Sequence, residues 1–255
     1  MHRLALAAFA AAAIAAPMAA TAALPQPIAK AAASPARADD AKLDARRKGP
    51  ELLAFAQVKP GQKVYDLIPG GGYFTRVFSK VVGPKGHVYA VWPSEYNKES
   101  GDDSDKLRKL GTQPGYTNIS VDVQPAAALT APKPLDVVFT SQNYHDYPDK
   151  FMGPTDPALL NKAVFAALKP GGVFVIVDHV AETGSGLRDT DTLHRIDPEI
   201  VKTQVTAAGF VFDGENDVLR NPADDHKVKV FDKSIRGHTD QFVFKFRKPS
   251  PASAH

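Results

Sequence analysis

The chain has 255 residues and a formal net charge of +3, with 44% hydrophobic residues, 23% charged residues and no cysteine. This composition is close to the globular average, which excludes fibrous and wholly disordered proteins, and the weak charge predicts no nucleic-acid partner. The absence of cysteine excludes disulfides, cysteine-ligated zinc and thiol catalysis, but it does not decide the compartment in which the protein works.

The first 22 residues have the organisation of a secretory signal peptide. Met1-His2-Arg3 is a basic head, the stretch from Leu4 to Ala16 is apolar, and Ala20-Thr21-Ala22 offers small residues to a signal peptidase. The apolar stretch is shorter than the ~20 residues that a membrane-spanning helix needs. We therefore expect cleavage after Ala22, no stable membrane anchor after cleavage, and a periplasmic or secreted protein. Cleavage after Ala20 and an uncleaved anchor are the alternatives.

The rest of the chain divides into three parts. Residues 23–40 are rich in alanine and proline and lack an apolar period, so we expect a disordered leader there. Residues 41–248 form one expected domain, and residues 249–255 form an expected disordered tail.

Apolar runs and helical patterns alternate through the domain. The expected helices cover residues 50–56, 73–82, 104–110, 157–168 and 198–208. The expected strands cover residues 64–68, 87–91, 118–123, 135–140, 173–178, 210–212 and 240–247. Near-continuous apolar strands separated by helices predict an α/β fold, with a mostly parallel seven-stranded sheet covered by helices on both faces. No helix joins the last two strands, which predicts an antiparallel last strand, and its alternation of phenylalanine with polar residues predicts an edge position.

A glycine cluster follows the first expected strand, in the run from Asp66 through Gly70-Gly71-Gly72 to Tyr73. In an open parallel sheet, ligands bind at the carboxyl ends of the strands, where glycines let the backbone approach a ligand closely. Asp66 could accept hydrogen bonds from amino or hydroxyl groups of such a ligand. A tight turn between a strand and a helix also needs glycine, so the cluster alone leaves both interpretations open.

The same segment resembles the first motif of the class I S-adenosylmethionine-dependent methyltransferases, a strand that ends in Asp/Glu-x-Gly-x-Gly-x-Gly. Asp66, Gly70 and Gly72 match this motif, whereas Ile68 stands where the first glycine is usual. The resemblance covers about residues 50–247 and is closest to a secreted bacterial subgroup of predicted methyltransferases. It implies a Rossmann-like fold, S-adenosylmethionine as cofactor and a small-molecule acceptor as substrate. It implies donor contacts from the following residues: Asp66, Gly70, Gly71, Gly72, Tyr73 and Asn143.

The sequence departs from the family pattern after the second strand. The family normally ends this strand with an acid that binds the ribose hydroxyls, and here Trp92 occupies that position. Glu95 could take the place of the acid, or Trp92 could stack on the adenine. The departures leave one alternative function, an exported non-catalytic ligand-binding protein on a methyltransferase fold. A dinucleotide-dependent oxidoreductase fits the glycine spacing less well.

A second candidate site follows the fourth strand, where His145 and Asp146 stand side by side. Methyl transfer requires the acceptor to lie in line with the methyl group, and it often requires removal of a proton. His145 with Asp146 is therefore predicted to orient or deprotonate the acceptor. The other interpretation is a solvated loop histidine.

The loop that follows Asp178-His179 is long and polar, and we expect it to cover the substrate. Its Arg188 and Arg195 could bind an anionic acceptor, or they could hold the loop together through Arg–Asp pairs. Asp178 and His179 could also form a metal set with His145 and Asp146, but no His-x-x-x-His spacing supports one, so we predict no metal. The insert at residues 214–238 is expected to be an exposed loop or small hairpin, with a lid or a dimer contact as candidate roles.

Overall fold

The computed structural model describes residues 23–153 and 155–250. The expected signal peptide (1–22) and most of the expected tail (251–255) lie outside the described residues. Within the two described ranges, no helix has both the length and the apolar character needed to cross a membrane.

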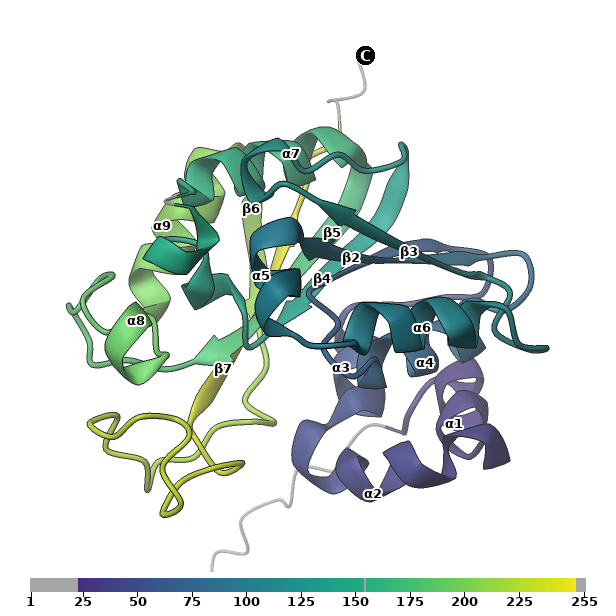
Figure 1. The fold of residues 1–255 in the computed structure, drawn as a ribbon, viewed down its shortest axis with the longest axis horizontal. Helices are drawn as coiled ribbons and strands as arrows, with labels where there is room; N and C mark the ends of the chain where they lie inside the picture. Colours follow the sequence, from purple (N-terminus) through teal and green to yellow (C-terminus); the bar gives the residue numbers. More distant parts are fainter. Residues whose placement is uncertain (1–22, 154, 251–255) are drawn as a thin grey trace, which may run out of the picture.

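A seven-stranded sheet forms the centre of the molecule (Figure 1). Its strands are β1 (Lys63–Leu67), β2 (His87–Pro93), β3 (Ile119–Gln124), β4 (Leu135–Ser141), β5 (Leu168–His179), β6 (Val211–Glu215) and β7 (Gln241–Arg247). They lie in the order β3-β2-β1-β4-β5-β7-β6. The pairs from β3 to β5 are parallel, while β7 runs antiparallel to both β5 and β6. The predicted mostly parallel seven-stranded sheet with an antiparallel last strand is confirmed.

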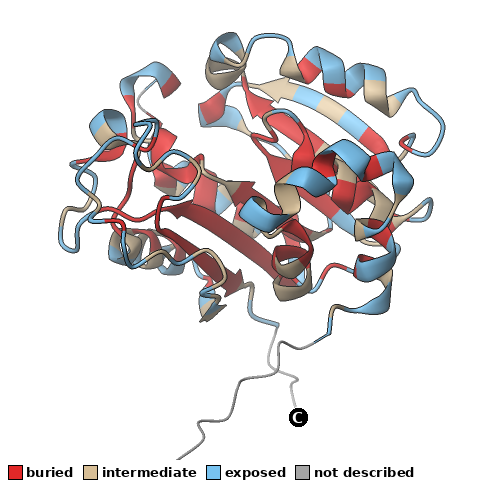
Figure 2. Cartoon of the chain, turned by 90° about the horizontal axis from the view of Figure 1, so that it is seen from below, coloured by how far each residue is buried: buried red, intermediate tan, exposed pale blue. Residues whose placement is uncertain are grey.

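Helices cover both faces of this sheet. The described helices are α1 (Gln26–Ala32), α2 (Ala38–Arg47), α3 (Gly49–Phe55), α4 (Tyr73–Val82), α5 (Ser94–Glu99), α6 (Asp103–Gly111), α7 (Pro157–Ala167), α8 (Thr190–Leu193) and α9 (Pro198–Ala207). Four short 3₁₀ turns join them, η1 (Pro35–Arg37), η2 (Ala126–Ala128), η3 (Tyr144–Asp146) and η4 (Lys150–Met152). Helices α7 and α9 contact each other on one face, and α4 packs with α1 and α3 on the other (Figure 1). Figure 2 shows the central strands buried between these layers, whereas the edge strands β3 and β6 are partly exposed.

Helix α4 has the bounds that the sequence predicts. Gly72 before it and Gly83 after it have positive φ angles of 79° and 65°, a conformation that glycine adopts without strain. Between them, Val77, Phe78 and Val81 are buried against the sheet. This helix therefore begins directly at the carboxyl end of β1.

The expected disordered leader is wrong for most of its length, because residues 26–32 form α1 and α2 begins at residue 38. Ile28 and Ala31 are buried on one side of α1, which contacts α3 and α4. Buried charges hold the segment that follows in place. Arg37 forms an ion pair with Asp44 at 2.8 Å, and Asp40 forms one with Arg76 on α4. An apolar periodicity cannot reveal such pairs, since the residues that are buried are charged.

The expected edge position of the last strand is also wrong. β7 lies between β5 and β6, which pair with both of its edges, and every residue of the strand except Arg247 is buried. Phe242, Phe244 and Phe246 are buried on one face, and Lys245 on the other is only 8% exposed. The ammonium group of Lys245 lies 4.6 Å from the centroid of the Phe55 ring, so its aliphatic stem packs while the charge contacts the ring. The alternation that resembled an edge strand therefore includes a buried lysine.

Candidate functional site

A cavity of about 760 Å³ lies at the carboxyl ends of β1, β4 and β5. The glycine loop after β1, helices α2, α5 and α6, and the loop after β4 contribute to its wall, together with residues from the insert before β7. Its volume is in the range of pockets that hold a cofactor or a drug-sized ligand. The sheet therefore presents a large cavity at the edge where ligands of α/β proteins bind.

The glycine loop contributes two of its three glycines to this cavity. A Cβ atom added at Gly70 or Gly71 would meet no atom within 4 Å, and both residues line the cavity. A Cβ at Gly72 would instead lie 2.3 Å from Leu107, so this glycine permits close packing against α6. Ile68, at the position of the usual first glycine, has a positive φ of 55°. This conformation is costly for a β-branched residue and explains why glycine is the usual choice there.

Asp66 and Tyr73 stabilise the glycine loop through hydrogen bonds to neighbouring elements. Asp66 is buried, accepts a hydrogen bond of 2.6 Å from the Thr75 hydroxyl, and is not among the cavity-lining residues. Burial raises the pKa of Asp66 to about 7, against the opposing effects of Thr75 and the Arg47 charge. Tyr73 lines the cavity, but its hydroxyl donates to Asp44 at 2.5 Å. It therefore fastens α2 to α4 beside the loop.

Trp92 and Glu95 lie away from the cavity. Trp92 is 0% exposed in the core, so the expected stacking of adenine on its ring is wrong. The Glu95 carboxylate accepts hydrogen bonds from the backbone N–H of Ala126 at 2.9 Å and from Ser94, and it braces the loop after β3. One turn further along α5, Glu99 lines the cavity, as does Asp103 at the start of α6. The i to i+4 spacing of a helix is the signal that could have found Glu99.

Asn143 lines the cavity and links two loops. Its amide group donates to the backbone oxygens of Ile68 at 3.0 Å and Ser141 at 2.7 Å. Its side-chain oxygen accepts a hydrogen bond of 3.2 Å from the Tyr96 hydroxyl. Asn143 thus holds the glycine loop, the end of β4 and α5 at fixed separations around the cavity.

His145 and Asp146 lie on η3 and reach the same cavity. The Nδ1 atom of His145 lies 2.8 Å from an Asp178 oxygen, and its Nε2 atom lies 3.2 Å from Asp146 and 3.3 Å from Nδ1 of His194. Burial lowers the pKa of His145, but the carboxylates of Asp178 and Asp146 outweigh it and raise this pKa well above its usual value. The interpretation as a solvated loop histidine is excluded by an exposure of 3%. No spacing in the sequence linked His194 to this pair.

Arg188 and Arg195, which the sequence offered as candidates for binding an anionic acceptor, form ion pairs within and between the loops instead. Arg195 is 0% exposed and makes a two-pronged pair with Asp224 at 2.9 and 3.1 Å. Arg188 pairs with Glu182 and Asp189. The alternative of Arg–Asp pairs that hold the loop is therefore confirmed for both, and the arginines that line the cavity are Arg47 and Arg76.

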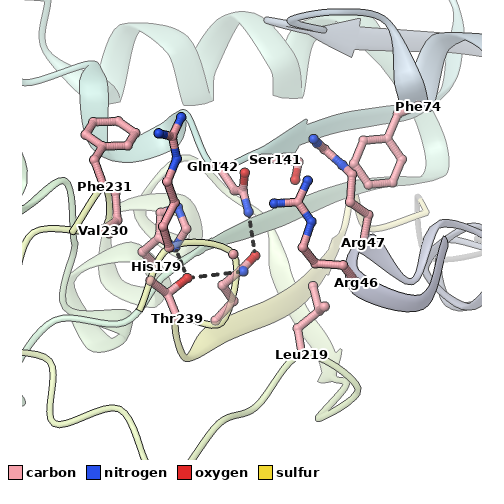
Figure 3. Close-up of a pocket in the computed structure, with 13 residues that line it drawn as sticks. Arg46, Arg47, Phe74, Ser141, Gln142, His179, Leu219, Val230, Phe231 and Thr239 are labelled. Carbon is pink, nitrogen blue, oxygen red and sulfur yellow. Dashed lines mark hydrogen bonds between the residues drawn. The ribbon is translucent and has the colours of Figure 1, made fainter. Parts of the chain in front are cut away.

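A smaller cavity of about 190 Å³ adjoins the first and shares Arg47, Gln142 and His179 with it (Figure 3). Figure 3 shows His179 bonded to Thr239, and the distance is 2.7 Å. Burial lowers the pKa of His179 to about 4. The insert contributes Phe231 to both cavities, so this expected exposed loop covers part of the site.

Comparison with solved structures defines the class of fold. A SAM-dependent methyltransferase from Aquifex aeolicus superposes with a TM-score of 0.56 at 19% identity, covering 87% of this chain and 96% of that one. The [4+2]-cyclase SpnF superposes with a TM-score of 0.59 at 17% identity, covering 81% of each chain. The chain therefore has the Rossmann-like fold of SAM-dependent methyltransferases, which also occurs in a cyclase.

Relatives in sequence agree with this fold. The ubiquinone/menaquinone biosynthesis C-methyltransferase UbiE of Vibrio cholerae is 30% identical over 191 residues, which are 73% of this chain and 62% of that protein. The chain spans 41% of the length of the Pasteurella multocida UbiE, which it matches at 34% identity over 122 residues. No protein-family model matches the chain. The resemblance to SAM-dependent methyltransferases that the glycine motif predicts is confirmed by sequence and by fold.

Proposed function

We propose that the chain is an exported S-adenosylmethionine-dependent methyltransferase that acts on a small-molecule acceptor. The observation that carries this proposal is the single cavity of about 760 Å³ that runs from Gly70-Gly71 to His145 and Asp146. Relatives named as C-methyltransferases support the reaction, and the signal-like first 22 residues support export.

The glycine loop fits the donor, because the backbone at Gly70 and Gly71 is open to the cavity and carries no side chain that would occupy it. Glu99 and Asp103 line the same cavity, and their carboxylates fit the ribose hydroxyls, which are hydrogen-bond donors. Glu99 thus takes the ribose-binding role for which the sequence offered Glu95. When bound, S-adenosylmethionine supplies a methyl group activated by its sulfonium.

Asp66 supports the loop rather than the donor in this proposal. Its carboxyl group accepts from Thr75 at the first turn of α4, so it holds the start of the helix against the end of β1. Gly72 and Tyr73 act in the same way, by close packing with Leu107 and by bonding to Asp44. Besides Glu99 and Asp103, the donor contacts are then left to Gly70, Gly71 and backbone groups fixed by Asn143.

The acceptor end of the cavity is the part lined by His145 and Asp146. Methyl transfer is accelerated when the acceptor atom is held in line with the methyl group, and both residues are fixed by hydrogen bonds that prevent their rotation. We assign them the role of orienting the acceptor. The insert residue Phe231 lines the cavity on this side, with its ring centroid 4.9 Å from that of His194.

The exported non-catalytic ligand-binding protein is the second candidate. The burial of Trp92 and the glutamate-to-backbone contact of Glu95 favour it, because they leave the end of β2 without the usual ribose acid. A cyclase has the same fold, so the fold alone does not define the reaction.

A transfer assay separates the two candidates. The chain from residue 23 onward is incubated with S-adenosylmethionine labelled in the methyl group and a panel of phenols, quinols, amines and thiols. We expect label in at least one acceptor. We expect Gly71→Leu to lose this transfer, because it places a side chain in the cavity at a residue whose φ is not positive and which leucine can therefore occupy without backbone strain. Donor binding without transfer to any acceptor would support the non-catalytic protein instead.

A further inference from the structure

Three side chains from two segments direct metal-binding atoms toward one point in the cavity. Nε2 of His145 lies 3.2 Å from Oδ1 of Asp146 and 3.3 Å from Nδ1 of His194, and the distance from His194 to Asp146 is 3.7 Å. His145 and Asp146 come from η3, while His194 follows α8, so the fold brings them together across 48 residues of sequence or more. Sequence spacing alone could not show this set.

These separations match those of ligands around one metal ion. Nitrogen and oxygen ligands lie about 2.0–2.2 Å from Zn²⁺, which places neighbouring tetrahedral ligands about 3.3 Å apart. The rings of His145 and His194 stand at 89° to each other, so their ring nitrogens meet at one point without stacking. Two imidazoles and one carboxylate form the donor set that binds divalent first-row transition metals.

The surroundings of His145 fix the ring as a metal ligand requires. Its Nδ1 atom lies 2.8 Å from Oδ1 of Asp178, so this nitrogen carries the proton and Nε2 faces the cluster. Asp178 is itself held by the backbone N–H groups of His145 and His179, each at 2.8 Å. A carboxylate that orients a ligating histidine from behind is the usual support of a protein metal site.

The cluster is open on the side of the substrate. His145, Asp146 and His194 all line the cavity of about 760 Å³. Three protein ligands leave at least one coordination position for a water or a substrate atom, as in catalytic metal sites. A bound ion takes the place of a proton on Nε2 of His145, so that two neutral imidazoles and one carboxylate leave a net charge of +1 on the divalent ion, which favours an anionic oxygen as the next ligand.

We propose that His145, Asp146 and His194 bind one divalent transition-metal ion, such as Zn²⁺, with Asp178 orienting His145. This proposal departs from the prediction, made from sequence spacing, that the protein has no metal site. An oxygen of the acceptor, such as a phenolate or enolate, is its ligand in the open position. The role toward the acceptor rests on the proposed function, but the metal site itself does not, since it is measured without a methyl donor.

The test is a titration of the metal alone. The chain from residue 23 onward is stripped with a chelator and titrated with Zn²⁺ by calorimetry and with Co²⁺ by visible absorption. We expect one ion per chain and the visible bands of cobalt bound by nitrogen and oxygen. A folded wild-type chain that binds neither ion would overturn the proposal and leave a hydrogen-bonded cluster only.

Variants locate the ion. His194→Ala is expected to weaken binding by at least about 100-fold, and Asp178→Asn by about 10–100-fold. His238→Ala is the control, because His238 is exposed and outside the cluster. His194→Gln serves as a second ligand variant if the alanine variant does not fold. Unchanged affinity in folded His194 variants would show that the ion binds elsewhere and would contradict the assignment.

Discussion

Asp66 illustrates how burial sets the behaviour of a single residue in this protein. Its pKa is about 7 in the folded chain, whereas its ordinary value is 3.8. Between these two values the folded state holds a proton that the unfolded state has released. The free energy of unfolding therefore falls as the pH rises from about 4 to about 7, since ionised Asp66 is disfavoured inside the protein.

Asp66→Asn should remove this dependence. The amide keeps the oxygen that accepts from Thr75 but cannot ionise. We expect the melting temperature of the wild type to fall more than that of the variant between about pH 5 and pH 8. The difference should correspond to on the order of 2 kcal/mol, or roughly 4–8 °C.

Thermal melts at the two pH values test this prediction, with the exposed Asp39→Asn as control. Parallel pH profiles for the wild type and Asp66→Asn would contradict the raised pKa.

Gly70 tests the donor end of the cavity at the same scale. A leucine at this position would project into the cavity, and we expect Gly70→Leu to weaken S-adenosylmethionine binding by at least about 100-fold, or ~3 kcal/mol. Gly83→Leu is the matched control, because Gly83 also has a positive φ and open space around it, at the far end of α4. Calorimetric titration of both variants with the donor measures the difference. Equal affinities would place the donor away from the glycine loop.

At the scale of elements, the fully buried pair of Arg195 and Asp224 fastens the insert to the loop after α8. Asp224 also accepts from the backbone N–H of Asp240, at the entrance to β7. Removing one partner leaves the other charge buried without compensation. The pair therefore holds in place the part of the insert that lines the cavity, which has no regular secondary structure of its own.

Asp224→Ala is expected to lower the free energy of unfolding by about 3–5 kcal/mol. The neighbouring Asp225→Ala is the control, because Asp225 is exposed, and it should change stability by no more than about 0.5 kcal/mol. Denaturant unfolding followed by circular dichroism measures both. A small effect at Asp224 would show that the insert is held by other contacts.

The sequence predicts the elements whose signal is apolar and local. β4 and residues 173–177 of β5 are nearly continuous apolar runs, and α4 is bounded by glycines, so these elements follow from pattern alone. α2 does not, because its burial depends on charge pairs such as Asp40 with Arg76, which join residues far apart in sequence, and α1 is a single short helix that buries only Ile28 and Ala31. The candidate site divides in the same way: Gly70, Gly71, His145 and Asp146 follow motifs, whereas Glu99, Arg47 and His194 reach the cavity only through the fold.

At the scale of the whole molecule, the N-terminal helices act as part of the domain and not as a leader. They bury Ile28 against the domain and place Asp40 on Arg76, whose guanidinium also donates to the carbonyl of Gly71 at 2.8 Å. This chain of contacts links the N-terminal segment to the glycine loop. Stability and donor binding should therefore depend on the same segment.

Removal of residues 23–47 is expected to lower the melting temperature by about 5–10 °C and to weaken donor binding. Removal of residues 23–25 alone is the control, since α1 begins at Gln26. Thermal melts and donor titrations of the two truncated chains give the comparison. If this segment were a disordered leader, neither truncation would change the melting temperature or the affinity for the donor.

The central claim is that the cavity between the glycine loop and His145 binds S-adenosylmethionine. The most direct measurement is a calorimetric titration of the chain from residue 23 onward with S-adenosylmethionine and its demethylated product. The account predicts one site per chain with a Kd at or below about 1 mM for the donor. A folded chain that gives no heat and no thermal shift with either compound at several millimolar would contradict it.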